Sequence, residues 1–88
     1  MKLHEGFITY FTGDEQIMVA SGSALEKFRG MARSNATAAF LIDSLKEEIT
    51  RDALVEKMVA RYDAPRDVIA RDVDAVLNTL RSIGALDE

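Results

Sequence analysis

The sequence predicts a small α+β domain of winged-helix-like class, in which a three-stranded antiparallel sheet is followed by three helices. Two observations support this prediction. Short runs of β-branched and aromatic residues flank a glycine turn in the first quarter of the chain, as in a hairpin. Apolar residues recur at helical spacing through the second half. With 88 residues the chain is expected to form a single domain, residues 1–88.

The sheet is predicted from three segments. Residues 7–12 and 16–20 have strand composition, and the glycine and acidic residues between them supply a turn. Residues 21–23 break the second strand. Residues 27–33 lie between this break and a helix cap, and Gly30 among them favours a bulge or a close backbone approach. We expect residues 27–33 to form a third, short strand at the edge of the sheet.

The first two helices are predicted from their caps. Asn35 is a good N-cap for a helix over residues 36–46, and Thr50 for a second over residues 51–61. The second helix carries one apolar stripe, formed by Leu54, Val55, Met58, Val59 and Tyr62.

The third helix is the clearest element. Pro65 suits its first turn, where a missing N–H costs nothing, and Gly84 is the expected C-terminal stop. We expect Leu86 to fold back over the end of this helix. One face carries the apolar positions Ile69, Val73, Val76, Leu77, Leu80 and Ile83.

Composition excludes several classes of function. The net charge is −4 with a sequence pI near 4.9, whereas nucleic-acid-binding domains usually carry a basic patch or a high pI. There is no cysteine, which removes disulfides and thiolate metal sites. The longest apolar run, residues 38–42, is too short to cross a bilayer, and the N-terminus lacks a signal-peptide core. We expect a cytoplasmic protein with no membrane partner.

No residue pattern indicates catalysis. His4 is the only histidine, lies near the terminus and has no cysteine to pair with, so it completes neither a catalytic couple nor a metal site. The glycines are dispersed and form no phosphate-binding loop. We expect a binding protein without catalytic residues, metal or cofactor, rather than an enzyme.

An edge strand offers a specific binding mode. Its outer backbone N–H and C=O groups have no partner and can pair with an extended peptide. Simple alternation puts the three cations on one side of the segment, although a bulge at Gly30 would reverse its later half. The cations either meet an acidic peptide or are solvated charges that prevent aggregation, and the residues alone leave both open. The segment consists of Lys27, Phe28, Arg29, Gly30, Met31, Ala32 and Arg33.

The run from Lys27 to Leu41, KFRGMARSNATAAFL, resembles the signature F-x-G-[ML]-x-R-x-N-x-T-[GA]-A-F-[IL] of PqqD-like proteins, also called RiPP recognition elements. The resemblance extends over about residues 6–86 and ends in IGAL at residues 83–86. It implies a small winged-helix-like domain that binds the leader segment of a ribosomally made precursor peptide. The domain then presents that leader to a modifying enzyme, often a radical-SAM protein.

The resemblance also implies where the leader binds. It would add to the third strand, at residues 27–33, and rest in the groove between that strand and the third helix. On the third helix the resemblance indicates a flank beside the apolar stripe, at Val68, Asp72 and Ala75. Ala32 stands where a branched residue is usual, and Ser34 where an apolar residue is frequent. These two differences leave the identity of the peptide open.

Two other functions fit the same order of elements. A winged-helix nucleic-acid binder would need a basic helix, and the second helix offers Arg51, Lys57 and Arg61, diluted by Asp52 and Glu56. Alternatively, the exposed strand edge pairs with a second copy of the chain.

Overall fold

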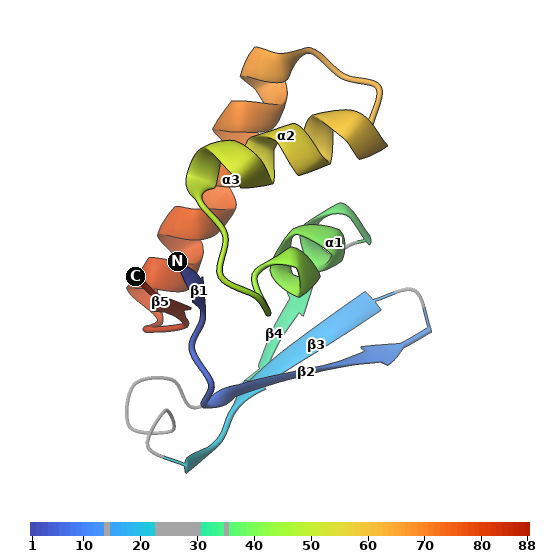
Figure 1. Ribbon diagram of the computed structural model, residues 1–88. Coiled ribbons are helices and arrows are strands. Elements are labelled where there is room, and N and C mark those ends of the chain that lie inside the picture. The colour runs from blue at the N-terminus through green and yellow to red at the C-terminus, as the bar shows by residue number, and fades with distance from the viewer. Residues whose placement is uncertain (14, 23–30, 35) are drawn as a thin grey trace.

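The computed structural model describes residues 1–13, 15–22, 31–34 and 36–88. Strands precede the three helices, with one short strand after them, and the predicted α+β class is confirmed. Helix α1 lies over one face of the larger sheet, and α2 and α3 lie beyond it (Figure 1). The elements are β1 (Lys2–Leu3), β2 (Phe7–Thr12), β3 (Glu15–Ala20), β4 (Met31–Ser34), α1 (Ala36–Ser44), α2 (Arg51–Arg61), α3 (Arg66–Ser82) and β5 (Leu86–Asp87).

The larger sheet is antiparallel with the order β2-β3-β4, so β4 lies at an edge among the described strands, as predicted. Strands β2 and β3 form a hairpin in which Thr12 pairs with Glu15. Gly13 in its turn has φ +65°, a left-handed conformation that glycine adopts without strain. Strand β4 extends through Ser34, while Lys27, Phe28, Arg29 and Gly30 lie outside the described residues. The bulge expected at Gly30 and the cap expected at Asn35 fall there too.

A second, two-stranded sheet joins the two ends of the chain and was not predicted. Strand β1 pairs antiparallel with β5, with Leu3 opposite Leu86. The N–H of Leu3 donates to the carbonyl of Leu45 at 2.7 Å, and that of His4 to the carbonyl of Ala85 at 2.8 Å. Strands of two residues carry too little periodicity to be recognised in a sequence. The expected return of Leu86 over the end of α3 occurs in this form.

The core lies where α1, α2 and α3 meet the inner face of the sheet. Its members are apolar and almost completely excluded from solvent, and they come from every larger element except β4, whose side chains are not described. Among the largest are Met18, Leu41, Leu45, Leu54, Val73 and Leu77. This packing fixes the helices relative to the sheet.

The helix ends follow the predicted signals closely. The hydroxyl of Thr50 accepts a 3.1 Å hydrogen bond from the N–H of Ala53, as an N-cap should. At the end of α3, Gly84 has φ +74°, and the N–H of Ala85 donates to the carbonyl of Leu80 at 2.8 Å. Together with the bond from the N–H of Gly84 to the carbonyl of Arg81, this bond forms a Schellman motif, which explains why the helix stops there.

Helix α1 ends at Ser44, two residues before the predicted end at position 46. The N–H groups of Leu45 and Lys46 donate to the carbonyls of Ile42 and Asp43, three residues back, so the last turn tightens out of α-helical geometry.

No helix in the described ranges has the length and hydropathy needed to span a bilayer.

Candidate functional site

The outer edge of β4 exposes backbone groups whose direction follows from the strand register. A two-residue loop makes its flanking residues, here Thr12 and Glu15, a hydrogen-bonded pair. Bonded and non-bonded pairs then alternate along the hairpin. The 2.6 Å bond from the N–H of Ser21 to the carbonyl of Gly6 lies at a bonded position of the same series, which supports the assignment.

The alternation decides which residues of β4 face outward. In β3, Met18 directs its N–H and C=O away from β2 and therefore toward its partner Ala32 on β4. Ser34 is likewise bonded to β3. Met31 and Arg33 then direct their N–H and C=O away from the sheet, where no described strand lies. This edge can pair with an extended guest through two donors and two acceptors.

An apolar groove lies between α1, α2 and α3, with a volume of about 430 Å³. Thr37 and Ala38, in the first turn of α1, form one wall, and that turn starts directly after β4. The exposed carboxylate of Asp72 contributes a negative charge at the opposite wall. The remaining lining is mostly apolar: Leu41, Met58, Tyr62, Ala64, Ile69, Val73, Ala75 and Val76.

Two of the three predicted helix residues line this groove. Asp72 and Ala75 are exposed on α3 and face it. Val68 is an exposed apolar residue, 39% accessible to solvent, but it is not among the residues that line the groove. The structure therefore brings the α3 flank and the start of α1 together, beside the end of β4.

The sequence analysis missed the contributions of α1 and α2 to the groove. Thr37, Ala38 and Leu41 stood inside the quoted run of residues 27–41, and Tyr62 lies at the end of α2. Tyr62 was assigned only to the apolar stripe of the second helix, because periodicity does not show where neighbouring helices diverge.

The other edge of the sheet has different surroundings. The hollow beside β2 is lined by Lys2, His4, Glu5 and Lys46 as well as apolar residues. Apolar side chains of a guest strand would find the better environment next to β4.

Arg51, one of the three basic residues of α2, is engaged by acidic side chains of the same chain. The guanidinium of Arg51 makes two 2.9 Å hydrogen bonds to the carboxylate of Asp74 on α3, and a third bond to Asp52. The bond to Asp74 is the main reason that the pKa of Arg51 is raised, and the same bond lowers the pKa of Asp74. Arg51 is thus engaged within the chain, which weakens the case for a nucleic-acid-binding helix.

The side chains that the structure describes contain no cluster of three histidine or acidic residues able to hold a metal ion. The described part of the molecule offers a backbone edge and an apolar groove.

Comparison with known proteins gives the family. Residues 15–86 match the model of Coenzyme PQQ synthesis protein D (PqqD). The solved structure of TbiB1 in complex with the TbiA(beta) leader peptide superposes with a TM-score of 0.81 and 18% sequence identity, covering 99% of this chain and 95% of that one. No curated protein matches the chain. Because the family model spans most of the sequence, the chain belongs to the PqqD family.

Proposed function

We propose that this protein binds the leader segment of a ribosomally made precursor peptide by strand addition to β4 and presents it to a modifying enzyme. The observation that carries the proposal is the outward-facing backbone of Met31 and Arg33 next to the apolar groove. Proteins of the PqqD family are non-catalytic peptide-binding chaperones, so the chain is a binding protein and not an enzyme. TbiB1, which shares the fold, forms a complex with a leader peptide.

In this proposal the whole chain, residues 1–88, acts as one peptide-binding domain. The guest contacts the described residues Met31, Ala32 and Arg33, and the preceding residues Lys27, Phe28, Arg29 and Gly30 belong to the proposed site. On α3 it contacts Asp72 and Ala75, with Val68 at the periphery.

The strand edge and the apolar groove contribute to the free energy of peptide binding in different ways. Four backbone hydrogen bonds contribute roughly 2–6 kcal/mol in total, whereas micromolar affinity requires about 8 kcal/mol. Burial of apolar guest side chains in the groove supplies the difference, at about 25 cal/mol per Å². The edge therefore fixes the register of the guest, and the groove selects its side chains.

We further propose that the modifying enzyme, of the radical-SAM class or another, meets the bound leader in the cytoplasm. The protein then performs no bond chemistry. It raises the concentration of the precursor near the enzyme and so reduces the entropic cost of their encounter.

The decisive experiment is an amide NMR titration with the cognate leader peptide. We expect the largest shifts at the amides of Met31 and Arg33 and at groove residues such as Ala38 and Ala75. Shifts confined to β2, for example at Thr9 and Phe11, would place the guest on the other edge. Shifts confined to α2 with β4 silent would refute the proposal.

A further inference from the structure

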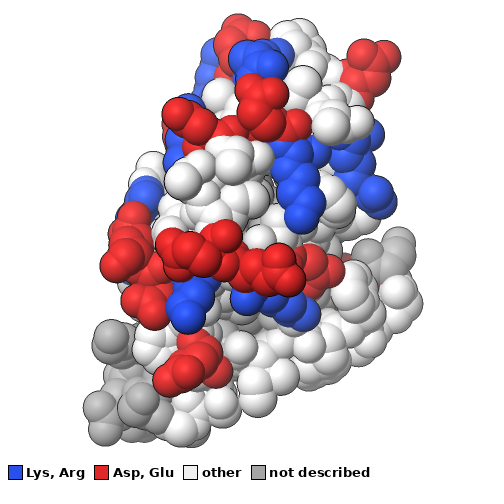
Figure 2. Space-filling model, in the orientation of Figure 1, with Lys and Arg blue, Asp and Glu red and all other residues white. Residues whose placement is uncertain are grey.

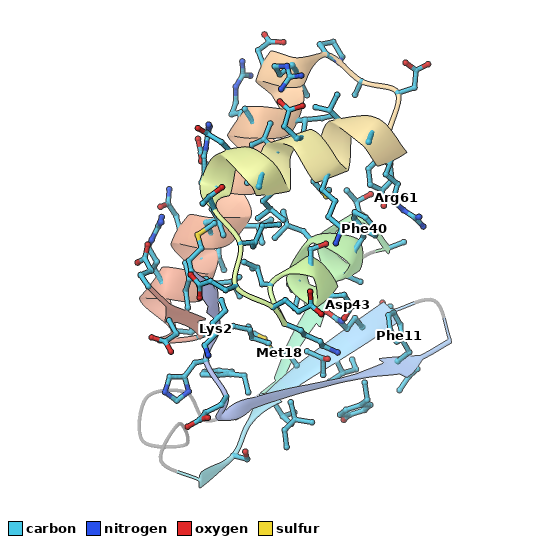
Figure 3. The ribbon with its side chains drawn as sticks, viewed as in Figure 1. Lys2, Phe11, Met18, Phe40, Asp43 and Arg61 are labelled. Carbon is cyan, nitrogen blue, oxygen red and sulfur yellow. The ribbon has the colours of Figure 1, made fainter. Side chains whose placement is uncertain are left out.

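A second hollow lies on the side of α1 that faces the tip of the β2–β3 hairpin. Its volume is about 330 Å³, and α1 separates it from the groove described above. Figure 3 shows Phe11 on the hairpin, Phe40 on α1 and Arg61 at the end of α2 on this side of the molecule. Gly13, Ala36, Ala39 and Asp43 complete the lining.

Apolar surface is unusually available here. The ring of Phe11 is 59% exposed, the largest value among the exposed large apolar side chains in the described residues. Phe40 is half-buried, and its ring meets that of Tyr62 edge-on at 6.1 Å. The two phenylalanines thus offer ring surface to an apolar group placed between the hairpin and α1.

Two cations lie over the Phe40 ring: Arg61, which lines the hollow, and Lys57, one turn earlier on α2. The guanidinium carbon of Arg61 lies 4.5 Å from the centre of the Phe40 ring, and the Lys57 ammonium lies 5.8 Å from the same centre. A guanidinium stacked on a ring keeps its in-plane N–H donors directed outward. From this position the guanidinium of Arg61 can donate two parallel hydrogen bonds to a carboxylate.

Arg61 differs in its partners from three other arginines of the helices. Arg51, Arg66 and Arg81 are each bonded to a carboxylate of the same chain. In the described part of the chain no carboxylate bonds Arg61 or Lys57. Figure 2 shows basic side chains gathered on the right of this face, above the hairpin.

The acidic residue in the lining does not cancel this charge. The carboxylate of Asp43 accepts a 3.0 Å bond from the Gln16 amide and lies 3.3 Å from the Lys46 ammonium. Its charge is therefore already compensated, and the rim of the hollow is positive on a chain whose net charge is −4.

We propose that this hollow is a second docking site, which takes a protein segment that carries carboxylates next to an aromatic side chain. The aromatic ring of the segment packs on Phe11 and Phe40, and its carboxylates bond Arg61 and Lys57. Because α1 stands between the hollow and the groove, the site is open to a partner protein while a peptide occupies β4. The proposal does not depend on the identity of that peptide.

The probe is a blocked hexapeptide of sequence DEFDEF, titrated into the full chain by amide NMR at low ionic strength, where surface charges are least screened. Its neutral isostere NQFNQF is the ligand control. We expect saturable shifts at the amides of Gly13 and Phe40 with the acidic peptide alone. Binding persists when a leader peptide saturates β4.

Charge reversal provides the matched test. Arg61→Glu is expected to weaken binding of the acidic peptide by roughly tenfold or more, because it replaces charge-assisted hydrogen bonds with repulsion between carboxylates. Arg71→Glu is the control, since Arg71 is exposed on α3 and has no bonded carboxylate among the described side chains; it should change the affinity by less than about twofold. Arg61→Lys keeps the positive charge but removes the planar guanidinium group, so we expect a loss of peptide affinity between those of the other two variants.

Three results would overturn the proposal: no saturable shift at Gly13 and Phe40, equal effects of the two charge reversals, or an acidic peptide that shifts β4 amides and is displaced by a leader. None of these results would change the outcome of the leader titration, so the proposed second docking site can be refuted without refuting leader binding at β4.

Discussion

Adjacent proline substitutions in β4 test the outward direction of the Arg33 backbone. Proline removes one N–H, and edge strands tolerate it only where that N–H faces away from the sheet. Arg33→Pro should remove one donor to the guest and leave the ladder with β3 intact. Ala32→Pro should remove a bond to Met18, because Ala32 forms a bonded pair with that residue.

The two variants should therefore have opposite effects. One lost edge bond is worth about 1 kcal/mol, so Arg33→Pro should weaken leader binding by about fivefold relative to Arg33→Ala, at nearly unchanged stability. Ala32→Pro should lower the free energy of unfolding by about 1–3 kcal/mol, since it leaves a carbonyl of β3 unsatisfied. Urea unfolding and isothermal titration measure the two quantities. If Arg33→Pro binds the leader as well as Arg33→Ala does, the guest does not pair with this edge.

Three further predictions concern the groove, the core and pH. Ala75→Phe should fill the groove and weaken leader binding at least about tenfold, whereas Ala60→Phe, on exposed α2 surface, should not; equal affinities would exclude the groove as the site. Leu54→Ala should lower the free energy of unfolding by about 2–5 kcal/mol in urea, because Leu54 is fully buried; a loss below about 1 kcal/mol would contradict the packing described. The hydrogen bond from Arg51 lowers the pKa of Asp74 in the folded state, so the unfolded chain takes up protons first as the pH falls. The urea midpoint of the unmodified protein should then decrease below about pH 4, and that of Asp74→Asn should decrease less steeply. Identical pH profiles of the two proteins would show that this exposed pair contributes nothing to stability.

Much of the fold could be predicted because its signals are local. The caps at Thr50 and Gly84 depend on bonds within a few residues, and both helix ends were found close to where these residues placed them. The hairpin followed from strand composition around one turn. The residues between positions 27 and 41 are sufficient to indicate the family, which the match over residues 15–86 confirms.

The site depended on contacts between distant segments. The sequence by itself predicted an edge strand before α1 and contained no recognised catalytic motif. Only the tertiary structure decided that the backbones of Met31 and Arg33 face outward and that Thr37 and Ala75 line the same groove. It also paired β1 with β5 and placed Phe11 near Arg61. Strand pairing and groove shape arise from packing across the chain, which no local periodicity encodes.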